Sequence, residues 1–397
     1  MKRIVVLCDG TWNRSDAANP TNVVRLARAL APVGADGVVQ VPIYIEGVGT
    51  GRGVTRLARW SDKVLGGALG WGLMDNVVEA YRHIVFLHEP QDEIYLFGFS
   101  RGAFTARSLA GFIRSTGIID RDRLWLLPEA VARYRRRDDP KTHPDHVESF
   151  HFRSRMSLRG VTSPKEAEHR AAENMPEAPL VNIAYLGVWD TVGALGVPNH
   201  LLVAPLLNRR KYAFHNTKLS RLVHSARHAI ALDERRASFA PTRWTLADEV
   251  LPFSEGPDAR YQERFFLGDH GSVGGGGDIL DLSSIALNWM IDGAQAAGLT
   301  FDPVERQAVQ RQMNPMGPLH NFSQPRKGLG NWITNLRPVD RTGPARMEEL
   351  HASVTTRWAG KTTKSRYRPG SLKRVETELA AAFGSQRPRD GMDRDFA

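Results

Sequence analysis

The stretch that decides the fold reads Ile94-Tyr95-Leu96-Phe97-Gly98-Phe99-Ser100-Arg101-Gly102-Ala103. Its apolar beginning predicts a buried strand, and the residues after Gly102 predict a helix. Ser100 stands between them in the spacing G-x-S-x-G, where the two glycines let strand and helix approach closely. A serine on such a turn is placed to act as a nucleophile, because free N–H groups at the helix start can stabilise an oxyanion beside it.

Outward from this stretch, strand and helix signals alternate along the chain. Apolar runs predict strands at residues 4–8, 37–45, 93–98, 181–188 and 264–267. Helical periodicity predicts helices at residues 21–30, 73–87, 101–114, 219–231 and 283–297. This alternation predicts an α/β fold of α/β-hydrolase type, with a mostly parallel sheet, helices on both faces and a helical insertion.

Two stretches depart from the alternation and suggest how the chain is divided. We expect an α/β-hydrolase domain at residues 1–300, within which residues 116–180 are rich in Arg, His, Glu and Pro and form a lid or helical insertion. Residues 301–385 contain several prolines and few strand signals, so they are expected to be a C-terminal extension packed on the core. The polar residues 386–397 are expected to be a disordered tail.

The composition sets the class of protein and its partners. Of the 397 residues 42% are hydrophobic, which is enough for a sizeable core, and the net charge of +10 favours anionic partners. Basic residues at 132–142 and 361–374 suggest docking to an anionic membrane surface, since no nucleic-acid-binding module is recognisable. The sequence does not indicate an oligomeric state.

Cellular location is only loosely indicated by the sequence. Cys8 is the only cysteine, so no intramolecular disulfide points to an oxidising compartment. The apolar run within the first ten residues is too short for the core of a signal peptide, and no apolar run has the length of a membrane span. A cytoplasmic location is therefore the default expectation, and export without a cleaved signal stays open.

A serine nucleophile needs a carboxylate and a histidine, which follow it in that order in this fold. Asp190 comes directly after the apolar strand at residues 181–188, where an acid faces the crevice at the carboxyl end of a sheet. Asp233 is a rival, but Glu234 and Arg235 beside it suggest an ion-pair network. Asp269 is another rival, although it adjoins the candidate base in sequence and would approach it awkwardly.

The candidate base is His270. It follows the strand at residues 264–267 and stands on a glycine-rich loop that runs to Gly277. Among 13 histidines, it combines the required order with a position at a strand end. His224 and His228 lie four apart on a predicted helix, but they lack the acid of an H-E-x-x-H metal motif. We therefore expect no metal and no cofactor.

These residues predict acyl transfer. His270 would take the proton of Ser100, and Asp190 would hold the imidazole. The Arg101 backbone N–H would supply half of the oxyanion hole. The other half is expected from Gly10 and Thr11 after the first strand, with Thr50 as the alternative.

Several motifs in order resemble the DUF2235 family of α/β-hydrolases over residues 3–295. They are the opening Val5-Val6-Leu7-Cys8-Asp9-Gly10-Thr11-Trp12-Asn13, then Thr21-Asn22-Val23, Gly47-Val48-Gly49-Thr50-Gly51, the serine motif at 98–107, Val188-Trp189-Asp190-Thr191-Val192-Gly193 and Ala231-Leu232-Asp233-Glu234-Arg235. The family includes phospholipase effectors of the type VI secretion system. The resemblance implies hydrolysis of acyl esters of membrane phospholipids, with Ser100, Asp190 and His270 as the triad.

The chain departs from the family in the loop of the candidate base. The family pattern resembles G-x-H-S-D-V-G-G-G-Y, whereas this sequence has Gly271, Ser272 and Gly277 at the usual Ser, Asp and Tyr. This departure suggests one alternative, a catalytically weak, hydrolase-like interaction protein. A second alternative is a phosphate- or nucleotide-binding module that uses the loop at residues 47–53, although Arg52 stands in place of a third glycine.

Overall fold

The computed structural model describes residues 1–11, 13–47, 67–136, 139–193, 218–248, 250–254, 256, 259–323, 338–360 and 366–383. Three features named above fall elsewhere. Thr50, most of the loop at residues 47–53 and the tail at 386–397 lie outside these described residues.

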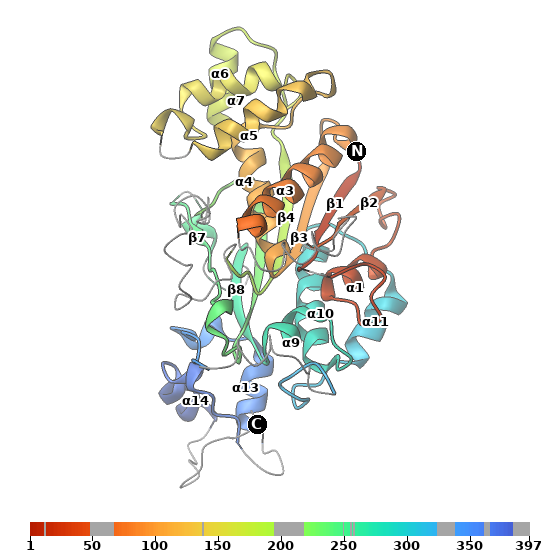
Figure 1. Cartoon of the computed structure of the whole chain (residues 1–397), viewed down its shortest axis with the longest axis vertical. Helices are drawn as coiled ribbons and strands as arrows, with labels where there is room; N and C mark the ends of the chain where they lie inside the picture. The colour runs from red at the N-terminus through yellow and green to blue at the C-terminus, as the bar shows by residue number, and fades with distance from the viewer. Residues whose placement is uncertain are drawn as a thin grey trace.

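A six-stranded parallel sheet forms the centre of the molecule (Figure 1), in the order β2-β1-β3-β4-β6-β8. Its strands are β1 (Arg3–Cys8), β2 (Gln40–Ile45), β3 (Glu93–Phe99), β4 (Asn182–Trp189), β6 (Val223–Ala231) and β8 (Tyr261–Phe266). The strands β5 (Lys218–Leu219) and β7 (Thr245–Leu246) form a second, two-stranded sheet. The predicted α/β fold with a mostly parallel sheet is confirmed.

Helices cover both faces of the large sheet, which explains why its strands are apolar runs rather than alternating patterns. Along β1, Ile4 and Val6 pack against α3 and α4 on one face, whereas Val5 and Leu7 pack against α1 and α10 on the other. These helices are α1 (Asn22–Ala29), α3 (Gly67–Leu87), α4 (Arg101–Thr116) and α10 (Asp281–Ala296). Two hydrophobic cores therefore sandwich the sheet.

The prediction of a helix at residues 219–231 is wrong, because most of that segment is β6, which lies between β4 and β8 in the sheet. Its alanines favour a helix in isolation. In the sheet, Ala226, Ala229 and Ala231 are fully buried, so the tertiary setting overrides that preference.

Residues 116–180 form a helical insertion, but they do not form a lid. Because β3 and β4 are parallel, α4 carries the chain from the carboxyl end of β3 back to the edge where β4 begins. The insertion starts at that edge, and Arg121 and Arg159 form ion pairs with Glu89, just before β3. In Figure 1 it lies at the top, far from α9. Its helices are α5 (Leu127–Arg135), α6 (Val147–Met156) and α7 (Pro164–Ala172).

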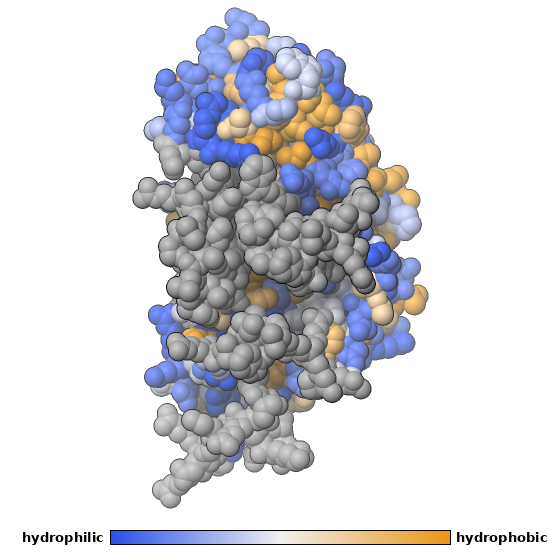
Figure 2. Space-filling view, viewed as in Figure 1, coloured by the Kyte–Doolittle hydropathy of each residue, from blue (hydrophilic) through white to orange (hydrophobic). Residues whose placement is uncertain are grey.

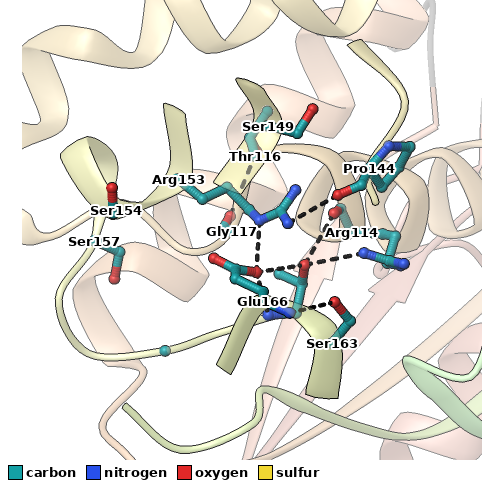
Figure 3. A network of polar contacts seen from close by, with 12 residues as sticks. Arg114, Thr116, Gly117, Pro144, Ser149, Arg153, Ser154, Ser157, Ser163 and Glu166 are labelled. Atoms are coloured by element: carbon teal, nitrogen blue, oxygen red, sulfur yellow. Dashed lines mark hydrogen bonds and ion pairs between the residues drawn. The ribbon is translucent and has the colours of Figure 1, made fainter. Parts of the chain in front are cut away.

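The helical insertion is held together by a buried charge cluster around Glu166 (Figure 3). Arg153 Nε donates to Glu166 Oε2 at 2.7 Å, and Arg170 Nη2 donates to Glu166 Oε1 at 2.9 Å. The Thr162 backbone N–H also donates to Glu166 Oε2, at 2.9 Å. Arg153 further donates to the Ser115 carbonyl, so the cluster fastens α6 and α7 to the end of α4.

The C-terminal segment (the described residues within 338–383) packs on the core rather than beside it. The His351 N–H donates to the Phe265 carbonyl at 3.0 Å, which extends contact to β8 at the edge of the sheet. Val354, Trp358 and Leu379 belong to the same hydrophobic core as Phe265. Helix α11 (Pro303–Arg311) follows α10, and the C-terminal segment contains α13 (Ala352–Ala359) and α14 (Glu376–Phe383).

The described surface is mostly polar, with an apolar area near the top of the face in Figure 2, where the helical insertion lies. Trp125 in this insertion is 75% exposed. Among the described helices, none combines the length and the apolar character that crossing a bilayer would require.

Candidate active site

The carboxyl edge of the large sheet brings together the three residues expected to carry the chemistry. Ser100 follows β3, Asp190 follows β4 and His270 follows β8. Since β3 and β4 are neighbours, the Ser100 N–H donates to the Trp189 carbonyl at 3.0 Å, directly beside Asp190. The parallel topology therefore places the elbow and the acid next to each other.

Ser100 has the strained backbone of a nucleophile elbow. Its φ is 59° and its ψ is −120°, a backbone conformation that residues other than glycine rarely adopt. A Cβ at Gly102 would lie 2.1 Å from the Cys8 carbonyl oxygen, and one at Gly98 would lie 2.3 Å from the Gly102 carbonyl oxygen. The two glycines of the motif are thus required by the close packing of β3, α4 and β1.

His270 is bonded to Asp190. The distance between His270 Nδ1 and Asp190 Oδ2 is 2.6 Å, and both side chains are buried. The rings of Phe99 and Phe239 pack against the imidazole, with centroids 4.6 Å and 4.8 Å away. This bond fixes the ring orientation and leaves Nε2 available. In the described structure no hydrogen bond joins Ser100 to His270, and Phe99 is the contact between their two segments.

The segment predicted as a glycine-rich loop begins as a short helix, α9 (His270–Gly274). Asp269 caps it by accepting a hydrogen bond from the Ser272 N–H at 2.8 Å, so this rival acid has a structural role. A Cβ at Gly271 would lie 2.5 Å from Asn321 Nδ2, and one at Gly277 would lie 1.8 Å from the Asn321 carbonyl oxygen. The glycines at these family-variable positions therefore make room for Asn321.

Arg341 is a site residue that the sequence did not reveal. Its Nη1 donates to Asp190 Oδ1 at 2.7 Å, and its Nη2 donates to Asp190 Oδ2 at 2.9 Å. The Ala231 N–H also donates to Asp190 Oδ1, at 2.9 Å. Burial alone would raise the pKa of Asp190, but the charge of Arg341 and the hydrogen bond from His270 outweigh it and hold this pKa below its usual value. Asp190 is therefore a carboxylate at neutral pH.

His228 supports the turn that carries Asp190 and does not bind a metal with His224. Its Nε2 accepts from the Thr191 N–H at 3.2 Å, and its Nδ1 lies 2.8 Å from Glu263 Oε1. His224 and His228 lie on a strand, where a spacing of four residues spans about 13 Å, too far for a shared ion. No group of potential metal ligands gathers among the described residues.

Asp233, the other rival acid, was expected in an ion-pair network but forms no ion pair with the described residues. It accepts hydrogen bonds from the Tyr367 hydroxyl at 2.8 Å and from the Gly268 N–H at 2.7 Å. Burial raises its pKa to about 7. Its neighbour Glu234 forms the ion pair instead, with Arg236 at 2.6 Å.

The oxyanion-hole candidates are not equivalent. The Gly10 N–H donates to Asp9 Oδ1 at 2.7 Å, so it is occupied, contrary to the expectation that it faces the substrate. Asp9 is held in turn by Thr21 and Tyr44, whose hydroxyls donate to its Oδ2 at 2.7 Å and 2.8 Å. The Thr11 hydroxyl is buried and has no partner among the described residues.

The chain is similar in sequence to known proteins. A family model for the catalytic domain of the type VI secretion phospholipase effector Tle1 and its relatives matches residues 2–293. An uncharacterized protein of Saccharomyces cerevisiae is 28% identical over 245 residues, or 60% of this chain. The match covers 32% of that protein, so the chain spans about a third of its length.

Two solved structures also align with the chain, at low similarity. The Tle1 effector bound to the VgrG spike has a TM-score of 0.45 and 16% identity, covering 79% of this chain and 76% of that one. An uncharacterized protein from Pseudomonas aeruginosa has a TM-score of 0.41 and 18% identity, covering 98% of this chain and 60% of that one. The family match covers well over half of the chain, and it confirms the resemblance that the motifs indicated. The chain belongs to the family of Tle1-like phospholipase effector catalytic domains of the type VI secretion system.

Proposed function

We propose that this protein is a serine hydrolase that cleaves an acyl ester through Ser100, Asp190 and His270. The observation that carries the proposal is the buried bond between His270 Nδ1 and Asp190 Oδ2, at the edge where Ser100 occupies an elbow. With Nδ1 held by Asp190, the free Nε2 of His270 is the nitrogen that can accept the proton of Ser100.

The reaction runs in two halves. Ser100 Oγ attacks the ester carbonyl carbon while its proton passes to His270 Nε2, and the protonated imidazole then gives this proton to the departing alcohol. The resulting acyl-enzyme is attacked by water, whose proton passes to His270, and the carboxylic acid leaves as Ser100 regains its proton. Asp190 stabilises the imidazolium in both halves.

The oxyanion that forms in each half needs N–H donors. We assign one to the Arg101 backbone, because the first N–H groups of a helix have no intrahelical acceptor. We assign the other to the backbone N–H of Thr11 rather than that of Gly10, because the Gly10 N–H is bonded to Asp9.

The substrate class that we propose is a phospholipid ester. Family membership supports a lipid substrate. The side chain of Arg101, immediately after the nucleophile, supports an anionic one, because it has no ion pair or hydrogen bond among the described residues. Burial lowers its pKa to about 10, so it remains a cation that can bind phosphate. An anionic membrane surface fits the basic C-terminal segment better than residues 132–142, whose described part belongs to the helical insertion at the opposite edge of the sheet.

Fluorophosphonate labelling tests the proposal. Wild-type protein should be labelled, Ser100→Ala should not, and Ser108→Ala, a serine on the same helix α4, should be labelled like wild type. An ester panel from short acyl chains to phospholipid should then give its highest kcat/KM on phospholipid. Absence of labelling in folded wild-type protein would contradict catalysis by Ser100.

A further inference from the structure

Arg341 lies outside the family match at residues 2–293, yet it contacts both oxygens of the candidate acid. Arg341 is 8% exposed and Asp190 is fully buried, so water does not compete for this pair. Two parallel N–H···O bonds from a planar guanidinium define the plane of a carboxylate as well as its position.

The guanidinium is itself fixed from its other side. Arg341 Nη1 donates to the Ala231 carbonyl at 2.8 Å, and Nη2 donates to the Phe239 carbonyl. Phe239 packs on His270, and Ala231 ends β6. Arg341 therefore joins the acid, the end of a central strand and the wall of the imidazole pocket in one arrangement.

The C-terminal segment that carries Arg341 is anchored at several points. The Tyr367 hydroxyl donates to Asp233 at 2.8 Å, and Leu350 pairs with Phe265 at the edge of β8. The Val339 N–H donates to the Arg235 carbonyl at 2.9 Å, two residues from Arg341. These contacts hold the segment in place independently of Arg341.

We infer that Arg341 is a positioning residue, which holds the Asp190 carboxylate in the orientation that binds His270, so that the working site extends beyond the family domain into the C-terminal segment. This inference rests on the proposed function of Asp190 and His270. It has an electrostatic consequence. The cation offsets part of the negative charge that Asp190 presents to the imidazole.

The charged groups that face the imidazole come from four parts of the chain. Asp190 lies at the end of β4, and Arg341 lies in the C-terminal segment. The segment after β6 contributes Glu234, whose Oε2 accepts from the His270 N–H at 3.2 Å, and its ion-pair partner Arg236. Asp269 precedes His270 and caps α9. Only Arg341 among these forms an ion pair with Asp190.

Two substitutions separate geometry from charge. Arg341→Met should slow fluorophosphonate labelling about 10²-fold, and should move the acid limb of its pH profile to higher pH, because the uncompensated charge of Asp190 attracts the protonated imidazole. Arg341→Lys keeps the charge but cannot bridge both oxygens, so labelling should slow while the acid limb stays at its wild-type pH.

A proton NMR spectrum gives a readout that does not need activity. The His270 Nδ1–H bonded to Asp190 should give a downfield signal in wild-type protein and in Ser100→Ala, and Arg341→Met should lose it. Arg153→Met is the matched control, since it removes a buried arginine from a carboxylate remote from the site and should leave both the signal and the acid limb unchanged.

The outcomes distinguish the two ideas. Loss of the downfield signal in Arg341→Met, together with an unlabelled wild type, would support positioning and refute the proposed function. A wild-type signal and a wild-type acid limb in folded Arg341→Met would overturn the inference, as would the same changes in Arg153→Met.

Discussion

Glu166 in the helical insertion and Asp190 in the candidate site are both fully buried carboxylates bonded to arginine. Glu166 is bound by two arginines, Arg153 and Arg170, and by neutral donors. Asp190 is bound by one arginine and by the imidazole of His270, the proposed proton acceptor. The same pairing of carboxylate and arginine therefore holds helices together in one region and, with one partner exchanged, contacts the proposed proton acceptor in the other.

The two regions also differ in how far apart their partners lie in the sequence. Arg170 follows Glu166 by four residues on α7, so the helix itself brings them together. Asp190 and Arg341 are separated by 151 residues and meet only when the C-terminal segment docks. The first cluster can form with its local fold, whereas the second depends on completion of the whole chain.

The largest difference should appear when each carboxylate becomes an amide. Asp190→Asn should slow fluorophosphonate labelling by about 10⁴-fold, because the amide selects the wrong imidazole tautomer. Glu166→Gln should leave the rate per folded molecule unchanged. Comparable losses in the two variants would remove the functional distinction between the regions.

In the helical insertion, the same change from carboxylate to amide should lower the stability of the protein. Glu166→Gln leaves two buried guanidinium groups without their carboxylate, which should lower the free energy of unfolding by about 3–5 kcal/mol. Glu168→Gln, an exposed residue on the same helix, should change it by less than about 0.5 kcal/mol. Urea denaturation followed by circular dichroism measures both, and equal effects would mean that the buried cluster does not stabilise the insertion.

Asp233 sharpens the comparison, because it is a buried carboxyl whose hydrogen-bond partners in the described structure are neutral. Burial raises its pKa to about 7, so the folded state keeps a proton that the unfolded state releases near its ordinary pKa of 3.8. The free energy of unfolding should therefore fall, on the order of 3 kcal/mol, as the pH rises from about 4 to about 7.

Asp233→Asn should remove this part of the pH dependence, because the amide stays neutral at every pH. Denaturation midpoints of both proteins across the pH range provide the check. If the denaturation midpoints of wild type and Asp233→Asn change with pH in parallel, the pKa of Asp233 is not raised in the folded protein.

Arg101 is the reverse case, an arginine without a carboxylate partner among the described residues. Arg101→Gln should reduce the ratio of kcat/KM for anionic phospholipid to that for a neutral short-chain ester roughly tenfold, since a charge-assisted hydrogen bond is lost. Arg101→Lys should restore part of the ratio. A ratio that is unchanged in Arg101→Gln would place the anionic group of the substrate elsewhere.

The parts of the molecule that could be predicted from the sequence are those with local signals. The elbow around Ser100 and the strand before Asp190 were readable because a buried parallel strand is a continuous apolar run that ends in a turn. The interior strand β6 could not be predicted in this way, because its alanines and polar residues favour a helix. Its partners, such as Glu263 on β8, are distant in the sequence. Arg341 has no motif around it, and nothing local relates it to Asp190.

The edge of the sheet at which the helical insertion lies follows from the topology of the chain. A helix that follows a nucleophile elbow in a parallel sheet returns to the opposite edge, so a segment inserted directly after α4 begins far from Ser100. Composition predicted that residues 116–180 are helical, but only the path of the chain shows which edge they cover.

The backbone at Ser100 and Asp190 has a consequence for protein engineering. Their φ angles are 59° and 39°, and each such conformation stores on the order of 1–3 kcal/mol in a residue with a side chain. Glycine relieves that strain at no steric cost. Glycine at position 190 would also leave the buried Arg341 guanidinium without its carboxylate, so the relief of strain should outweigh the loss only at position 100. A variant library sorted for heat resistance alone would accordingly be enriched in glycine at position 100 and would lose the proposed nucleophile, so directed evolution of this chain needs turnover and thermal tolerance to be selected in the same round.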